Sequence, residues 1–248
     1  MMILPLAVVF SFGLSAQPTP TLPDMPVSRS TPGWSKQGRS LLLHDENGNL
    51  SSEIGLSQED SGPVTREVRG GPSPDARAAW TLERRLTWNS PRTKLLESRR
   101  LLKIHGSTGQ LLWSDDAADI PEQGDPVAFS NSSKVVLIAK QLGESWGVEA
   151  RDWAGGLIVK SGPFSKVIAI RLSPAGQYAL IRWAVPDKSD THTFLDLTTK
   201  TRKDIETSEM TLGLARIGDD GVVRSGRREV FRFSAEKSTP SSAPDVAK

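Results

Sequence analysis

The chain has 248 residues, of which 37% are hydrophobic and 24% charged, the balance of an ordinary soluble globular protein with one or two domains. The formal net charge is only +2, from 31 Lys and Arg against 29 Asp and Glu, so the composition gives no reason to expect a nucleic-acid-binding protein. The sequence contains no Cys, which excludes disulfides, thiolate metal sites and the attachment site of a lipoprotein.

The first residues have the pattern of a secretion signal. Residues 1–16, "MMILPLAVVFSFGLSA", carry no charged side chain and form an apolar run that is short for a membrane span. The run ends in small residues suited to signal peptidase, with cleavage after Ala16 or Ser15. We therefore predict a periplasmic or secreted protein with no stable membrane span after cleavage, and an uncleaved anchor is the alternative.

Composition divides the remainder of the chain into three parts. Residues 17–38 are rich in Pro, Ser and Thr without apolar periodicity, which is typical of a disordered linker. Residues 237–248, "KSTPSSAPDVAK", have the same character and are expected to form a disordered tail. Residues 39–236 contain the apolar runs, so we expect the folded domain there.

Two turn motifs recur in the folded span. The first precedes an apolar run in "GPSPDARAAWTL", "VAFSNSSKVVLIA", "IRLSPAGQYALIRW" and "LARIGDDGVVRSG", and it begins at Ser73, Ser130, Ser173 and Gly218. The second lies between two apolar strands, and its copies align at Gly48, Gly109, Gly155 and Lys200. Both motifs recur at about 45 residues, the period of a β-propeller blade with four strands.

Local signals within the repeats make two further predictions. Asn47-Gly48 indicates a type I′ hairpin turn, in which both residues adopt a positive φ. The segment 91–104, "PRTKLLESRRLLKI", has the nearest approach to helical spacing, so a short helix there is an alternative to a strand. The other apolar runs are short and bounded by Gly, Pro, Asn or Ser, as expected for strands.

The sequence resembles the WD40-like or TolB-like repeat family. The resemblance is carried by "LSPAGQYALIRW" followed by "THTFLDLTTKTRKDI", and by Ser73-Pro74-Asp75 in an earlier copy. It covers residues 72–206 and implies an all-β, propeller-like fold. Members of this family commonly present protein-binding or scaffolding faces, so the resemblance implies a role of that class and carries over no catalytic residue.

The expected number of blades does not decide whether the ring of blades is open or closed. The folded span accommodates about four to five four-stranded blades, near the lower limit for a propeller. Closure requires the first hairpin, residues 39–54, to complete a blade with the last strands, residues 211–234. An open or incomplete array that needs a partner is the second possibility, and a β-sandwich is the third.

No sequence motif indicates catalysis, a cofactor or a metal site. "DENGNLSSEIGL" begins like a calcium loop, but Leu50 and Leu56 occupy the positions that need Gly and a bidentate Glu. A zincin motif and a nucleophile elbow are both absent. We therefore expect a non-enzymatic binding or scaffold module, and a hydrolase or other enzyme with an unrecognised site on a propeller face is the alternative.

The largest local excess of positive charge lies in "ERRLTWNSPRTKLLESRRLLK", within the longest interval between two repeats. Arg side chains hold carboxylates and phosphates in a bidentate manner, and loops carry binding more often than scaffolds do. The predicted partner is accordingly a protein or an anionic cell-envelope polymer, contacted by a projecting insertion. The predicted binding residues are Arg84, Arg85, Trp88, Arg92, Lys94, Arg99, Arg100 and Lys103.

Overall fold

The fold is all-β in the computed structural model, which describes residues 33–35, 37–121, 124–131, 134–185, 191–205 and 215–233. These residues form 18 strands and no helix. The predicted signal peptide and tail, and all but the end of the predicted linker, lie outside the described residues. No helix in the described part of the chain is long and apolar enough to cross a membrane.

The strands form five antiparallel sheets in which neighbours in sequence are neighbours in space. The first sheet contains β1 (Ser40–His44) and β2 (Leu50–Gly55). The second contains β3 (Gln58–Ser61), β4 (Val64–Pro72), β5 (Ala79–Trp88), β6 (Leu95–His105) and β7 (Leu111–Asp116). The third contains β8 (Val127–Phe129), β9 (Val135–Leu142), β10 (Ser145–Asp152) and β11 (Leu157–Phe164).

The last two sheets continue the same pattern. The fourth contains β12 (Lys166–Leu172), β13 (Tyr178–Ala184), β14 (Thr191–Asp196) and β15 (Arg202–Ile205). The fifth contains β16 (Ala215–Ile217), β17 (Val222–Ser225) and β18 (Arg228–Arg232). The predicted propeller-like array is confirmed: the third and fourth sheets have four strands, the second has five, and the sheets at the two ends have two and three.

Both repeat motifs occupy equivalent turns of successive sheets. The turns aligned at Gly48, Gly109, Gly155 and Lys200 join β1–β2, β6–β7, β10–β11 and β14–β15, and all four residues have a positive φ. The motif that begins at Ser73, Ser173 and Gly218 places Ala76, Gly176 and Gly221 at a positive φ three residues later. A shared backbone conformation at equivalent positions confirms the repeat.

One local prediction is wrong, and one alternative is excluded. Of the pair Asn47-Gly48, only Gly48 has a positive φ, and the β1–β2 register shifts between Leu43 and His44, so the hairpin has a bulge in place of a type I′ turn. The alternative helix in 91–104 is the strand β6, because residues 95–105 pair with β5 along its length. The tertiary pairing outweighs the weak helical spacing.

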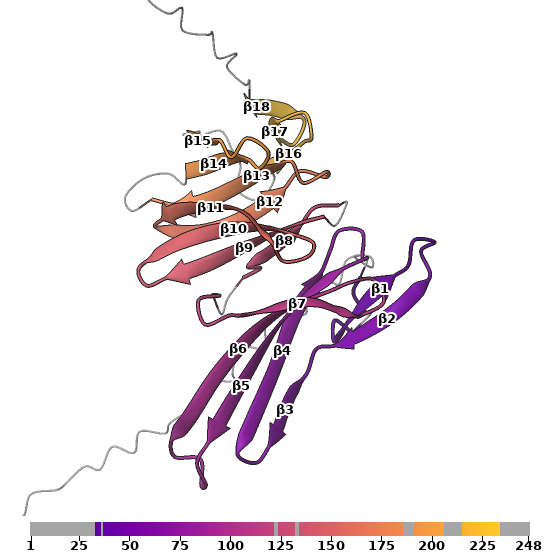
Figure 1. Ribbon diagram of the computed structural model, residues 1–248, viewed down its shortest axis with the longest axis vertical. Helices are drawn as coiled ribbons and strands as arrows, with labels where there is room; N and C mark the ends of the chain where they lie inside the picture. Colours follow the sequence, from indigo (N-terminus) through magenta and orange to yellow (C-terminus); the bar gives the residue numbers. More distant parts are fainter. Residues whose placement is uncertain are drawn as a thin grey trace, which may run out of the picture.

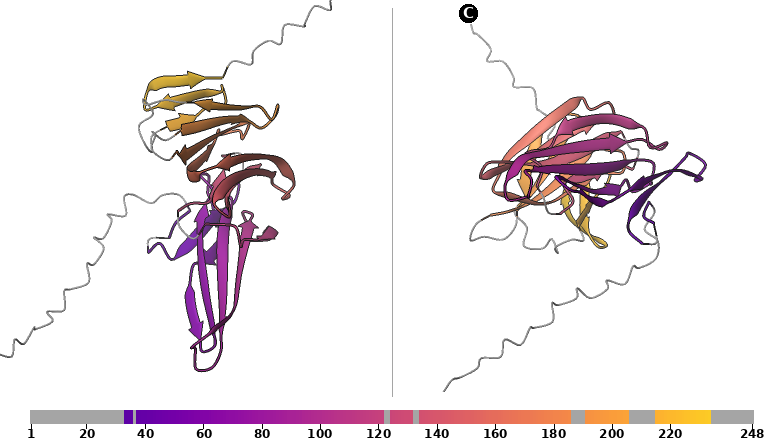
Figure 2. Two further views of the ribbon diagram at one scale, coloured as in Figure 1. Left: turned by 90° about the vertical axis from the view of Figure 1, so that its left-hand side faces the viewer. Right: turned by 90° about the horizontal axis from the view of Figure 1, so that it is seen from below.

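Apolar residues from adjacent sheets form the core between them. In β9, Val136 and Ile138 pack toward the second sheet, whereas Leu137 and Ala139 pack toward the fourth. β9 is therefore buried on both faces, which explains its nearly continuous apolar sequence. Figure 2 shows the resulting stack of sheets.

The ends of the array do not meet in the described residues. β1 and β2 form a sheet of their own, and Leu41 and Leu43 pack against Ala79 of β5. The three strands β16–β18 lie at the opposite end of the stack (Figure 1). The described residues therefore do not complete a blade from the first hairpin and the last strands, and they agree with the open or incomplete array, the second of the three possibilities. Trp34, from the predicted linker, forms a bridge with Leu41.

Candidate functional site

The predicted basic segment forms a long hairpin that extends away from the other sheets. It consists of β5, β6 and the turn between them, and Figure 1 shows it projecting with β3 and β4. β7 ends at Asp116, opposite Leu101, so the outer half of β6 has no neighbour on that side among the described strands. The expected projecting insertion is an extension of two strands, which positions its side chains more firmly than a loop would.

The pairing register divides the predicted cluster between two faces of the sheet. Arg84 lies directly opposite Arg100, and Arg85 lies directly opposite Arg99. Successive side chains of a strand point to opposite faces, so the two pairs lie on different sides of the hairpin. The eight predicted residues therefore share an element but do not form one surface.

Arg84 and Arg100 both contact other residues of the protein. The Nη1 atom of Arg84 lies 3.8 Å from the Oε2 atom of Glu67. Arg100 donates a hydrogen bond from Nη1 to the carbonyl oxygen of Ile120, 3.3 Å away. Both side chains are half-buried, so the guanidinium groups of this pair are less accessible to a partner than exposed ones.

Lys103 also has an internal partner. Its Nζ atom lies 2.5 Å from the Oε2 atom of Glu83, whose Oε1 atom accepts a hydrogen bond of 2.8 Å from Arg66. The hydrogen bond from Arg66 lowers the pKa of Glu83, and Lys103 lowers it further. Burial acts in the opposite direction, and the resulting pKa is about 2. This carboxylate is ionised at neutral pH, and Lys103 is largely committed to it.

The tip of the hairpin contains the next three predicted residues. Arg92 has a φ of 70° and holds both carboxylate oxygens of Asp60 with its guanidinium group. Trp88 is half-buried opposite Leu95, and its backbone N–H donates to the carbonyl oxygen of Pro63 at 2.7 Å. Lys94 is exposed.

Arg85 and Arg99 are the members of the cluster best placed to bind a partner. Both are exposed, and neither makes an ion pair or side-chain hydrogen bond within the described residues. Arg66 is the next residue across the sheet, on β4, but it is committed to Glu83. Like charges directly opposite each other destabilise a sheet. An anion bound between the two guanidinium groups would relieve this repulsion.

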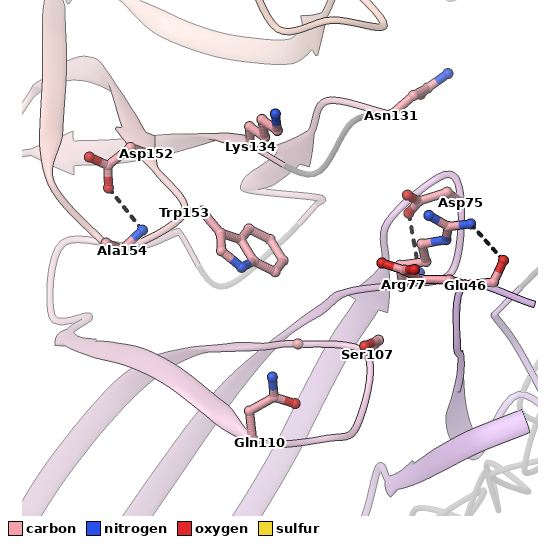
Figure 3. Close-up of a pocket in the computed structure, with 11 residues that line it drawn as sticks. Glu46, Asp75, Arg77, Ser107, Gln110, Asn131, Lys134, Asp152, Trp153 and Ala154 are labelled. Atoms are coloured by element: carbon pink, nitrogen blue, oxygen red, sulfur yellow. Dashed lines mark hydrogen bonds between the residues drawn. The ribbon is translucent and has the colours of Figure 1, made fainter.

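A concave surface lies on the rim formed by the turns of the first three sheets. It is a pocket of about 650 Å³, and we call it the rim pocket. Its lining residues are Glu46, Asp75, Arg77, Gly106, Ser107, Gln110, Asn131, Lys134, Asp152, Trp153 and Ala154. Figure 3 shows the indole of Trp153 in the middle, with Lys134 and Asn131 on one side and Ser107 and Gln110 on the other.

The sequence analysis did not predict the rim pocket, although it contained a usable signal. Both kinds of repeated turn contribute to it: Asp75 lies within one Ser motif and Lys134 follows another, whereas Gln110 and Trp153 adjoin the aligned Gly turns. Equivalent turns of successive blades lie on the same rim, so polar and aromatic residues in them are brought together. No group of three His, Cys, Asp or Glu side chains in the described residues could hold a metal ion.

Comparison with known proteins finds resemblance only among solved structures. No family model matches the chain, and no curated protein matches it. TolB from Acinetobacter baumannii is similar over 77% of this chain and 55% of its own, with 13% identity and a TM-score of 0.37. The propeller of Dos1 is similar over 75% of this chain and 61% of its own, with 10% identity and a TM-score of 0.37.

A third structure in the comparison is described by its open architecture. The β-propeller domain of the Trilobed protease from Pyrococcus furiosus, which has an open velcro topology, is similar over 57% of this chain and 43% of its own, with 8% identity and a TM-score of 0.39. The chain spans less than two thirds of each of these three structures. It thus has a weak resemblance to TolB and other β-propellers.

Proposed function

We propose that this protein is an exported, non-enzymatic binding or scaffold module that engages an anionic macromolecular partner through the β5–β6 hairpin. The observation that carries the proposal is the exposed pair of Arg85 and Arg99, opposed on a strand pair that projects beyond its neighbours. The partner is a protein with an acidic face or an anionic polymer of the cell envelope. The open, propeller-like stack is the scaffold that fixes the position of the hairpin.

Electrostatic complementarity of this kind mainly affects the rate of encounter and its salt dependence. Each of the two guanidinium groups can hold a phosphate or carboxylate through bidentate hydrogen bonds. Because both side chains are exposed, each contact contributes modestly and is screened by salt. Binding is therefore expected to weaken as the salt concentration rises.

Substitution of Arg85 and Arg99 with Ser tests the proposal without disturbing the packing. Short-chain polyphosphate serves as the anionic probe, and its dissociation constant is measured by calorimetry at several salt concentrations. The double variant is expected to bind about tenfold more weakly than the wild type, with a smaller salt dependence. Arg84 and Arg100 are left intact because they contact Glu67 and Ile120.

A matched control distinguishes the hairpin from general surface charge. Arg216 on β16 and Arg227 in the β17–β18 turn are exposed and remote from the hairpin, and their replacement with Ser removes the same net charge. This control is expected to bind polyphosphate like the wild type. Equal loss in both double variants, or no loss in either, would refute the role of the hairpin. Retention of partners from envelope extracts is expected to follow the same order.

Export is tested by the N-terminus of the native protein. The uncharged apolar start and the Pro-rich segment after it favour cleavage by signal peptidase. Mass spectrometry is expected to find a mature N-terminus near Ala16 or Gln17 in a periplasmic or secreted fraction. Intact Met1 in a soluble cytoplasmic fraction would contradict export and leave the hairpin proposal to be judged separately.

A further inference from the structure

We infer that the rim pocket binds a neutral oligosaccharide. The site lies among the turns of the first three sheets, apart from the Arg85 and Arg99 pair, so it is a function additional to the one proposed for the hairpin. Its volume of about 650 Å³ is within the usual range of small-molecule sites. The inference depends on the aromatic platform, the polar groups around it and their charge balance.

The turns that form the pocket are held by their own hydrogen bonds. The Oδ1 atom of Asp152 accepts bonds from the backbone N–H groups of Ala154, at 2.9 Å, and Gly156, at 2.7 Å. Across the pocket, the Oδ1 atom of Asp75 accepts bonds from the Ser73 hydroxyl at 2.5 Å and the Arg77 N–H at 3.2 Å. A ligand that meets turns already fixed in this way loses less affinity to ordering them.

Trp153 provides the apolar surface. The residue is half-buried and packs against the core cluster between the second and third sheets, which fixes the ring, while Figure 3 shows the indole facing the space between the turns. A large, rigid aromatic face of this kind suits the C–H face of a pyranose ring. The hydroxyl groups at the edge of such a ring then point toward the surrounding polar side chains.

Several polar side chains around Trp153 are available to a ligand. Glu46, Asn131 and Lys134 are exposed, and their side chains make no hydrogen bond or ion pair within the described residues. Gln110 accepts a bond at Oε1 from the backbone N–H of Thr108, at 3.1 Å, so its amide nitrogen can donate elsewhere. Together they offer carboxylate and carbonyl acceptors next to amide and ammonium donors, the mixture that adjacent sugar hydroxyls use.

The charges of the lining favour a neutral ligand over a phosphate. Three carboxylates, Glu46, Asp75 and Asp152, face two cations, Arg77 and Lys134. A phosphate or sulfate would be repelled by the carboxylates, and a purely apolar ligand would remove water from polar groups without replacing their hydrogen bonds. A ring with an apolar face and a hydroxylated edge satisfies both parts of the lining.

Saturation-transfer NMR with maltotetraose, cellotetraose and chitotetraose tests the inference. We expect the wild-type protein to bind at least one of them. Trp153→Leu, which keeps apolar packing but removes the aromatic face, is expected to weaken binding about tenfold. The double variant Asn131→Ala, Lys134→Ala changes exposed residues only, so it is expected to remain folded and also to bind more weakly.

Two controls give the experiment its specificity. Trp88→Leu changes a half-buried Trp on the hairpin and is expected to leave oligosaccharide binding unchanged. The Arg85→Ser, Arg99→Ser variant is likewise expected to bind oligosaccharide normally, so failure of the hairpin proposal and failure of this one are distinguishable. The inference is overturned if none of the three oligosaccharides binds, or if the Trp153 and Asn131–Lys134 variants both bind like the wild type.

Discussion

Replacement of Glu149 with Gln is expected to lower the free energy of unfolding by about 3 kcal/mol, because it removes the negative charge from a buried ionic cluster. The side chain of Glu149 on β10 is only 8% exposed. Its Oε1 atom lies 2.8 Å from the Nζ atom of Lys160, and its Oε2 atom lies 2.8 Å from the Nη2 atom of Arg151 and 3.5 Å from the Nζ atom of Lys140. Urea unfolding measures the effect.

The cluster also joins two sheets. Arg151 lies 2.8 Å from Asp115 of β7, and Lys140 lies 3.3 Å from Asp119. Lys140 and Arg151 are largely buried and lose their central counter-charge in the variant, which accounts for the large effect. Glu229→Gln is the matched control, because Glu229 pairs with Arg232 at an exposed position. An unfolding free energy for Glu149→Gln equal to that of the control would contradict the structural role of the cluster.

Protonation of Glu149 at low pH should destabilise the protein as the Glu149→Gln substitution does. Burial by itself would raise the pKa of Glu149, but the hydrogen bonds from Lys160 and Arg151 and the charge of Lys140 hold it at about 2, below the ordinary value of 4.5. A carboxylate with a depressed native pKa stabilises the fold at pH above 4.5, and this stabilisation is lost as the pH falls toward 2. The wild type should therefore lose stability across this interval more steeply than Glu149→Gln does.

Replacement of Phe194 with Ala is expected to release the fifth sheet from the stack. Phe194 on β14 is fully buried and stacks on Phe233 with ring centroids 4.7 Å apart. Phe231 and Tyr178 also contact its ring, at 5.6 and 5.3 Å. The loss of so large a buried ring should cost about 3 to 5 kcal/mol.

Because the fifth sheet lies at the end of the stack, the loss of stability caused by Phe194→Ala is expected mainly in that sheet. The three strands β16–β18 end the stack, and the core cluster around Phe194 is the interface that holds them to the fourth sheet. Hydrogen exchange is therefore expected to rise chiefly in β16–β18. Ile104→Ala, at the fully buried interface of the second and third sheets, is the control and should leave β16–β18 protected. Equal loss of protection throughout the chain in both variants would contradict an open stack.

The repeat was predictable from sequence because it depends on local backbone chemistry. Gly48, Gly109 and Gly155 all adopt the positive φ that a tight turn requires, and a regular spacing of such residues is visible without a structure. Lys200 was found only through alignment with them. The short apolar runs between these turns predicted strands, and therefore an all-β fold.

The division of the basic cluster between two faces was not predictable. A strand places alternate residues on opposite sides, so adjacent residues such as Arg84 and Arg85 separate as soon as the segment is extended. Which of the two Arg pairs has partners within the protein depends on Glu67 and Ile120, which lie outside the hairpin. Whether the array closes could not be predicted from the sequence either, because closure depends on contacts between the two ends of the folded domain.

The site of polyanion contact is the most direct test of the hairpin as the binding element. Hydrogen exchange of the wild-type protein is measured with and without short-chain polyphosphate at low salt. We expect added protection confined to the outer parts of β5 and β6, around Arg85 and Arg99, and its disappearance when the salt concentration is raised. Protection centred on the fourth or fifth sheet, or no protection of the hairpin under conditions in which polyphosphate binds, would contradict the proposal.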